Sequence, residues 1–444
     1  MRIAARILLG LALLAAGPGA WGQDLAPFEP GADYEYGLDA TRGRHYTVEL
    51  TASGFRWPGI DGDADTAFLE LPVAKARRRD PAIVAAAGPA RTRQTFEGRA
   101  RGRRYLDLSS LLGAAAAGSE VALAGEGMSW EPGPSQLHVY RSPSLAGRRV
   151  LVVAPHPDDA EIAAFGVYST SEADVVTVTA GDAGGRNFAS IYPDDGSHYR
   201  VKGWIRTWDS ISVPFYGGVP PGSARNLGFY DATLDRMWWE RPAALEPPLA
   251  ELEDPAFYRR LNTDPVLRDR PFRATWDGLV SDLLAELERV RPRTVVTPHP
   301  LLDRHLDHQF TTVALLEALE MWQGEYELYL YTNHAVGNEA WPFGPRGDVA
   351  GLPPWDGGEL FFSRLYSHPL AAETRHRKLI ALEAMHDLRP FDLRDGRLAE
   401  PGRRERERAA RLDYFRRAPR PNEIFLVASE ADGSRLLRAF LDQR

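Results

Sequence analysis

Short alternating runs of apolar and polar residues occupy the first third of the chain. Between residues 33 and 143 these runs are four to six residues long, and Gly, Pro and Asp separate them. A period of two is typical of strands that turn one face towards a core. The pattern predicts a small all-β, sandwich-like domain, with a short helix at 111–117 and strands at 45–50, 67–71, 104–108, 120–123 and 136–140.

The pattern changes after a linker-like stretch at 142–147. Continuous apolar runs follow, as in strands that are covered on both faces, and a segment with apolar residues at helical spacing lies between them. Strands that alternate with helices predict an α/β fold with a Rossmann-like, mainly parallel sheet and flanking helices. We expect strands at 149–154, 174–179, 293–297 and 423–428, and a helix at 276–287.

Two later stretches lack a clear apolar period. Residues 184–271 are rich in Gly, Pro and aromatic residues, and we expect a long irregular segment there that helps to form the substrate pocket. Residues 403–411 carry charges of both signs, as on a solvated helix face. The predicted domains are an accessory β domain at 23–145 and a catalytic domain at 146–444.

The first 22 residues have the pattern of a signal peptide. Arg2 and Arg6 precede an apolar run at 7–16, and small residues follow it. A bilayer span needs about 20 apolar residues, and neither this run nor any later one is long enough. We therefore expect an exported protein, periplasmic or secreted, whose mature chain has no transmembrane helix.

Composition limits the chemistry. The 444 residues include no cysteine, which excludes disulfides, a thiol nucleophile, an iron–sulfur cluster and zinc held by thiolates. The net charge of -8 argues against a nucleic-acid partner, because binding that polyanion normally requires a basic surface. Any metal site must therefore use histidine and carboxylate ligands.

Two clusters of such ligands each follow a predicted buried strand. His156-Pro-Asp-Asp-Ala-Glu-Ile162 follows the strand at 149–154, and the stretch from His299 to His308 follows the strand at 293–297. Ligands bind at the carboxyl ends of parallel strands, so we expect both clusters to face one crevice. An Asp pair at a helix start is also a common N-terminal cap, but the two clusters together indicate a metal-dependent hydrolytic site.

The same residues resemble a known family. The motif at 156–162, followed well downstream by His305-Leu-Asp-His308, is similar to that of the PIG-L/LmbE family of zinc-dependent N-acetylglucosaminide de-N-acetylases. The resemblance covers about residues 148 to 430 and leaves the β domain outside. It extends to 179–184 and 227–231, and less closely to 378–386.

The resemblance implies a role for each motif residue. The metal ligands would be His156, Asp159 and His308, with zinc as the metal and Fe²⁺ or Co²⁺ also acceptable to this set. Asp158 would be the general base, and His305 would stabilise the oxyanion or act as general acid, with Asp307 orienting it. Arg206 and Asp231 would bind the substrate. Arg206 lies in Arg-x-x-Asp where the family has Arg-x-x-Glu.

The expected function is hydrolysis of the N-acetyl group of N-acetylglucosamine-type sugars in an exported glycan or glycolipid, with Asp158 taking a proton from the attacking metal-bound water. Two alternatives stay open: a metal amide or ester hydrolase with a non-sugar substrate, and a non-catalytic glycan-binding or assembly protein. The sequence predicts no oligomeric state.

Several other polar and aromatic residues have either two interpretations or only a structural one. Trp57 and Trp130 could stack on a sugar, although a place in the sandwich core is favoured. Asp182 and His299 could support the metal ligands or cap turns equally well. The remaining histidines considered are expected to be structural: His334, His368 and His376.

Overall fold

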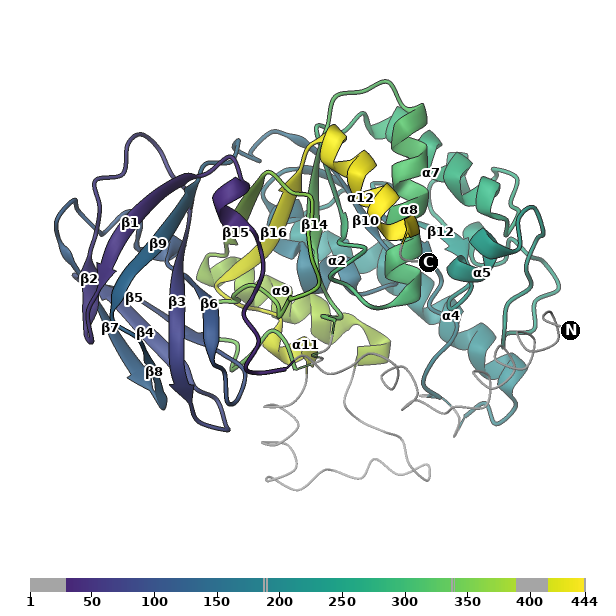
Figure 1. Cartoon of the computed structure of the whole chain (residues 1–444). Coiled ribbons are helices and arrows are strands. Elements are labelled where there is room, and N and C mark those ends of the chain that lie inside the picture. The colour runs from purple at the N-terminus through teal and green to yellow at the C-terminus, as the bar shows by residue number, and fades with distance from the viewer. Residues whose placement is uncertain are drawn as a thin grey trace, which may run out of the picture.

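The computed structural model describes residues 29–442 except 187, 189–190, 337, 339 and 389–413. The predicted signal peptide and the charged stretch at 403–411 lie outside the described residues. Two antiparallel sheets lie side by side at one end of the molecule, and a seven-stranded sheet with helices forms the rest (Figure 1). Among the described helices, none is both long and apolar enough to cross a membrane.

The two antiparallel sheets form the expected β-sandwich. One has the order β1-β9-β3-β6, with β8 paired to β3, and the other has the order β2-β7-β4-β5. Their strands are β1 (Arg44–Leu50), β2 (Gly54–Arg56), β3 (Thr66–Ala76), β4 (Ala82–Ala87), β5 (Ala90–Thr95), β6 (Gly102–Asp107), β7 (Glu120–Glu126), β8 (Met128–Trp130) and β9 (Gly133–Tyr140). The pattern missed β2, β4, β5 and β8, because the first and last have three residues, β4 is mostly alanine and β5 is mostly polar.

Of two predictions about the sandwich, one is wrong and one is confirmed. The helix expected at 111–117 is wrong: only a 3-10 turn, η4 (Ser109–Leu111), forms there. Of residues 113–117 only Ala115 is partly buried against the sandwich core, so a helix there would bury little apolar surface. Trp57 and Trp130 are buried in the sandwich core, and Trp130 Nε1 donates to the carbonyl of Thr51. This confirms their core interpretation.

The seven-stranded sheet has the order β12-β11-β10-β13-β14-β16-β15. The first five strands are parallel, and β16 runs antiparallel to both β14 and β15. Its strands are β10 (Arg149–Ala154), β11 (Glu172–Thr179), β12 (Ala224–Phe229), β13 (Thr294–Pro298), β14 (Glu327–Tyr331), β15 (Arg364–Pro369) and β16 (Asn422–Ala428). The structure is thus a mixed α/β fold with a mainly parallel sheet, although the sequence pattern missed β12, β14 and β15.

Helices cover both faces of this sheet. Leu151 and Val153 of β10 pack with α5, α7, α8 and α12 in one core, whereas Val150, Val152 and Ala154 pack with α2, α3 and α9 in another. The α-helices are α2 (Asp159–Ala163), α3 (Phe165–Ser169), α4 (Asp195–Ser212), α5 (Leu234–Trp239), α6 (Pro265–Arg268), α7 (Trp276–Val290), α8 (Leu306–Met321), α9 (Ala372–Ala384), α11 (Tyr414–Arg417) and α12 (Glu430–Asp442). Further 3-10 turns are η3 (Leu38–Ala40), η5 (Val213–Gly217), η6 (Arg259–Leu261) and η7 (His386–Leu388).

The expectation of an irregular segment at 184–271 is wrong, because several helices and a strand form within it. The segment contains the 18-residue helix α4 and the sheet strand β12. The buried face of α4 is polar, with Lys202, Arg206 and Asp209 among its buried residues, and β12 buries Arg225 and Asn226. A search for apolar periodicity misses elements whose core-facing side chains are polar.

The sandwich packs directly against the seven-stranded sheet. Asp107 at the end of β6 accepts hydrogen bonds from Ser367 of β15 at 2.6 Å and from Asn422 of β16 at 2.9 Å, and all three side chains are buried. Phe68 and Tyr105 of the sandwich belong to the same apolar core as the larger sheet. The residue division at 145/146 stays a prediction.

A buried ion pair holds β12 to α7. Arg225 and Glu286 are fully buried, and Arg225 Nη2 lies 2.8 Å from Glu286 Oε2. We expect Glu286→Ala to lower the free energy of unfolding by about 3–5 kcal/mol, because it leaves the buried guanidinium with less compensating charge. Urea denaturation measures this change. The exposed Glu288 of the same helix is the control, and Glu288→Ala should change stability by no more than about 0.5 kcal/mol; equal effects of the two substitutions would contradict the argument.

Candidate metal centre

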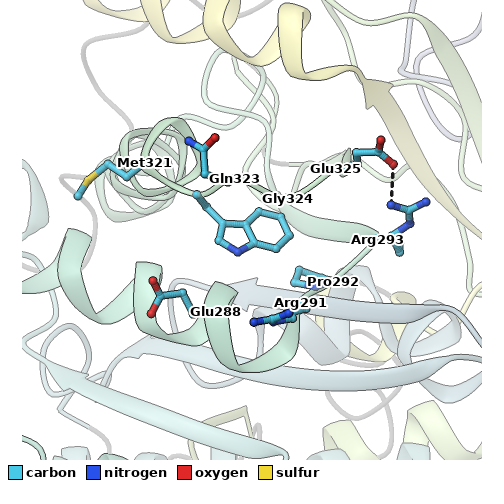
Figure 2. A pocket seen from close by; sticks show the side chains of 9 residues that line it. Glu288, Arg291, Pro292, Arg293, Met321, Gln323, Gly324 and Glu325 are labelled. Atoms are coloured by element: carbon cyan, nitrogen blue, oxygen red, sulfur yellow. Dashed lines mark hydrogen bonds and ion pairs between the residues drawn. The ribbon is translucent and has the colours of Figure 1, made fainter.

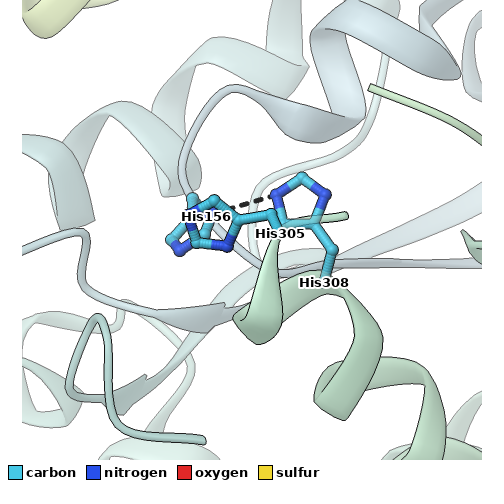
Figure 3. A group of neighbouring side chains, drawn as sticks. All are labelled: His156, His305 and His308. Atoms are coloured by element: carbon cyan, nitrogen blue, oxygen red, sulfur yellow. Dashed lines mark hydrogen bonds between the residues drawn. The ribbon is translucent and has the colours of Figure 1, made fainter. Parts of the chain in front are cut away.

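The two predicted clusters meet at one edge of the sheet. His156 follows β10, and His308 lies in the first turn of α8, which follows the neighbouring strand β13. Figure 3 shows the rings of His156, His305 and His308 gathered there. The carboxyl ends of adjacent parallel strands bring together residues about 150 positions apart, as the sequence predicted.

The three predicted metal ligands form a close triangle. His156 Nδ1 lies 3.2 Å from His308 Nε2 and 3.3 Å from Asp159 Oδ2, and His308 Nε2 lies 3.1 Å from the same oxygen. Ligand atoms about 2.0–2.1 Å from a tetrahedral zinc ion lie about 3.3–3.4 Å apart. Two imidazole nitrogens and one carboxylate oxygen therefore fit a zinc-like ion in both spacing and chemistry.

The electrostatic surroundings also favour a cation. Burial alone would lower the pKa of His308, but Asp159 and Asp303 outweigh it and raise the pKa to about 10. In the same way Asp231 and Asp159 overcome burial and raise the pKa of His156 well above its ordinary value. A divalent cation would supply the same positive charge and compete with these protons.

Two residues that the sequence analysis did not assign hold the ligands in place. Asp303 is fully buried, and its Oδ2 lies 3.1 Å from His308 Nδ1 while it accepts the main-chain N–H of Asn333 at 2.8 Å. Asn333 Nδ2 donates to Asp159 Oδ1 at 2.7 Å. A carboxylate on the far nitrogen of a ligand histidine fixes its tautomer and orientation. Asp303 lies within the second motif. Asn333 follows β14, so the position of this strand end is the sequence signal that could have indicated it.

We expect Asn333→Ala to weaken metal binding by about 10–100-fold, because Asp159 loses the side chain that orients it. Competition with a chromogenic zinc chelator measures the affinity. Asn338→Ala is the control, since the Asn338 side chain caps a local turn through Ala340 N. Wild-type zinc affinity in the Asn333 variant would show that Asp159 needs no support from this amide.

Asp158 has an unusual backbone and a paired side chain. Its φ of 134° lies in the region that favours glycine, and such strain is found at sites that the surrounding structure holds firmly. Its Oδ2 accepts a hydrogen bond from Arg206 Nη2 at 3.1 Å. Burial raises the pKa of Asp158 to about 7, and Arg206 partly offsets this effect. A divalent cation on the neighbouring ligands would lower this pKa further and favour the ionised carboxylate.

Arg206 is placed by the backbone as well as by Asp158. Its guanidinium donates to the carbonyls of Pro157 and Gly181, at 3.0 and 3.2 Å, and lies 3.5 Å from Asp387. The side chain is buried, and its contacts hold the loop that carries Asp158. The predicted substrate-binding role of Arg206 stays a prediction.

Asp231 and Asp307 both face the second nitrogen of His156. Their oxygens lie 3.1 and 3.2 Å from His156 Nε2. Asp307 also accepts the main-chain N–H groups of Ala232 and Leu234, which ties α8 to the start of α5. These contacts connect Asp307 to His156; its predicted role in orienting His305 stays a prediction, as does the contact of Asp231 with sugar hydroxyls.

His305 lies beside the ligand triangle. Its ring centroid is 4.8 Å from that of His156 and 4.8 Å from that of His308. Burial, together with the neighbouring His156, holds the pKa of His305 well below its ordinary value, so the ring is neutral. A neutral imidazole offers one N–H donor and one acceptor.

The sequence left two interpretations open for Asp182 and His299, and their contacts differ. Asp182 Oδ1 accepts the main-chain N–H of Asp231 at 2.8 Å, so it positions that residue. His299 accepts the N–H groups of Leu301 and Leu302 and thus caps a turn. His334 was expected to be structural; its ring centroid lies 5.0 Å from that of His308, and its role stays a prediction.

Four further residues that the sequence analysis singled out lie outside the ligand triangle: Lys378, His386, His368 and His376. Lys378 is buried and donates to the carbonyl of Ile162 and to Glu423, which fastens α9 to α2, the helix that contains the second half of the first motif. His386 Nδ1 lies 2.7 Å from Asp209 of α4. His368 lies against Tyr366, away from the metal centre, and His376 is exposed on α9.

A hollow of about 520 Å³ lies at the opposite end of the sheet (Figure 2). Arg293 lines it and immediately precedes β13, whereas His299 follows that strand. Its charged residues include an ion pair between Arg293 and Glu325 at 2.7 Å. The hollow is therefore separate from the metal centre and lacks its ligand chemistry.

Part of the chain is similar to known proteins. Two solved structures share weak similarity: a 4-carboxy-2-hydroxymuconate hydratase from Pseudomonas putida KT2440 (15% identity, 53% of this chain and 78% of that one, TM-score 0.33) and an acetyl xylan esterase from Butyrivibrio proteoclasticus (11% identity, 69% and 85%, TM-score 0.18). No curated protein matches. The profile of the PIG-L family, described as GlcNAc-PI de-N-acetylase, matches residues 151–319, which contain the ligand triangle.

Proposed function

We propose that this protein is a zinc-dependent hydrolase that removes N-acetyl groups from N-acetylglucosamine-type sugars in an exported glycan or glycolipid. The match to the PIG-L family supports a deacetylase or a related hydrolase. The observation that carries the proposal is the convergence of His156, Asp159 and His308 within 3.1–3.3 Å of one another, directly beside Asp158.

The proposed reaction divides the work among the residues of the site. His156, Asp159 and His308 would hold the metal, which when bound lowers the pKa of a water molecule and polarises the acetamide carbonyl. Asp158 accepts the proton of the attacking water, and Arg206 keeps its carboxylate in place. The same proton then passes to the amide nitrogen as the C–N bond breaks, so that the free amino sugar leaves and acetate is released. The neutral ring of His305 donates an N–H to the oxyanion that develops on the carbonyl oxygen.

Export and the β-sandwich complete the proposal. The predicted signal peptide favours a periplasmic or extracellular glycan or glycolipid over a cytoplasmic metabolite. The sandwich packs against β15 and β16, and we propose that it helps to position the larger substrate.

An acetate-release assay tests this function. Zinc-loaded protein is incubated with N-acetylglucosamine oligomers, N-acetylated peptides and acetyl esters, and acetate is measured by a coupled enzymatic assay. We expect acetate from the oligomers, with free amino sugar detected by mass spectrometry. Faster release from peptides or esters would move the substrate outside the sugars, and binding of the oligomers without any acetate would favour the non-catalytic alternative.

A further inference from the structure

A second cluster of imidazole and carboxylate groups lies in the β-sandwich, outside the PIG-L match. His45 of β1 and His138 of β9 face each other across the antiparallel pair, and Asp39 comes from the neighbouring turn η3. The Nδ1 atoms of the two histidines lie 2.8 Å apart, and one ligand atom from each of the three residues lies within 4.8 Å of the others. The cluster offers the same kinds of ligand as the metal centre.

The hydrogen bonding of His138 leaves a lone pair for a metal. His138 is fully buried, and its Nε2 lies 3.2 Å from Glu70 Oε1. An ionised carboxylate only accepts, so Nε2 carries the hydrogen, and in the neutral ring Nδ1 is then a bare acceptor. This Nδ1 faces His45. Glu70 contacts the far nitrogen of His138 just as Asp303 contacts the far nitrogen of His308. In this arrangement a carboxylate orients an imidazole that binds a metal.

The other two residues allow an ion to enter. Asp39 is exposed and His45 is half-buried, so the cluster opens to solvent on one side. An exposed carboxylate can close the remaining distance by rotating its side chain.

We propose that Asp39, His45 and His138 bind a second divalent transition-metal ion of the zinc type, and that this ion has a structural role. Asp39 belongs to a segment that lies between the sandwich and the larger sheet: Tyr36 donates its hydroxyl to the carbonyl of Pro353, and Arg42 N donates to the carbonyl of Ser363. A metal shared by Asp39 and the β1–β9 pair would fasten this segment to the sandwich and thereby to the catalytic part.

Counting bound metal tests the proposal on the full chain. The protein is stripped with a chelator, equilibrated with a small excess of zinc and desalted, and zinc per chain is measured by inductively coupled plasma mass spectrometry. We expect two ions in the wild type and one in His45→Gln, with acetate release retained by that variant. His308→Gln should also hold one ion, and the double variant none. His376→Gln, at an exposed position on α9, should keep two.

The outcomes separate this proposal from the proposed function. The second site would be overturned if His45→Gln still held two ions. It would also be overturned if the wild type held a single ion that was lost in His308→Gln. Either result would show that His45 and His138 only share a hydrogen bond. An unchanged count in His308→Gln would instead contradict the metal centre of the proposed enzyme.

Asp39→Asn gives a check that does not touch the sandwich core, because Asp39 is exposed. It should weaken zinc binding at this site at least about 10-fold, whereas the equally exposed Asp61→Asn should not.

Discussion

We expect Asp158→Asn to lower kcat for the proposed acetamide hydrolysis by about 10²–10⁴-fold, the usual contribution of a positioned general base. Asn has nearly the shape of Asp and can still accept the hydrogen bond from Arg206, but its amide cannot take a proton from water. Asn also tolerates a positive φ better than most residues, so the variant should fold with the backbone of the wild type. Steady-state acetate release gives kcat, and the zinc content should not change.

A second carboxylate beside Arg206 provides the matched control. Asp387 lies 3.5 Å from Arg206 on η7 and is not a neighbour of the metal ligands in sequence. Asp387→Asn should lower kcat far less than Asp158→Asn, because it leaves the proposed base intact. Similar losses in the two variants would indicate that the charge balance around Arg206 matters, and that Asp158 is not the base.

His308→Gln removes a proposed metal ligand, and it should lower zinc affinity by more than about 100-fold. Loss of a residue that only orients a ligand is expected to lower the affinity less than this. Acetate release should then fall below detection. His308 is fully buried and supplies one corner of the triangle, and Asp303 would keep a glutamine amide near the same position. Zinc affinity is measured by chelator competition, and activity with and without added zinc.

Chelation of the wild type distinguishes metal loss from misfolding. Stripped wild-type protein should lose activity and regain it with zinc, while its circular dichroism spectrum stays that of a folded protein. His308→Gln should give the same spectrum without regaining full activity at the same zinc concentration. Full activity in stripped protein would contradict a metal-dependent reaction.

The parts of the fold that follow apolar patterns could be predicted from the sequence. β10 begins and ends where its apolar run does, and α7 starts at the expected residue, Trp276. The elements that were missed bury polar side chains: α4 places Lys202 and Arg206 inside, and β12 buries Arg225. These groups are stable there because carboxylates and carbonyl oxygens surround them, which a pattern of hydropathy does not reveal.

The candidate site could likewise be predicted only in part. The motifs predicted which residues lie together, since His156 and His308 follow adjacent parallel strands. The residues that orient them could not all be found, because Asn333 follows β14, a strand that the sequence analysis did not recognise. Recognising the ends of all five parallel strands would have added Asn333 and would have favoured the supporting role of Asp182.

The contact between the sandwich and β15 bears on how the protein must be produced. β15 is the last strand of the seven-stranded sheet, and its free edge would offer unpaired main-chain groups to other chains. Thr66 of β3 accepts the N–H of Ser367 at this edge, and Phe68 covers apolar surface nearby. A fragment cut at the predicted boundary would uncover both the edge and the apolar patch, so it should aggregate even with its metal centre intact. The sandwich should therefore help to keep the larger sheet soluble.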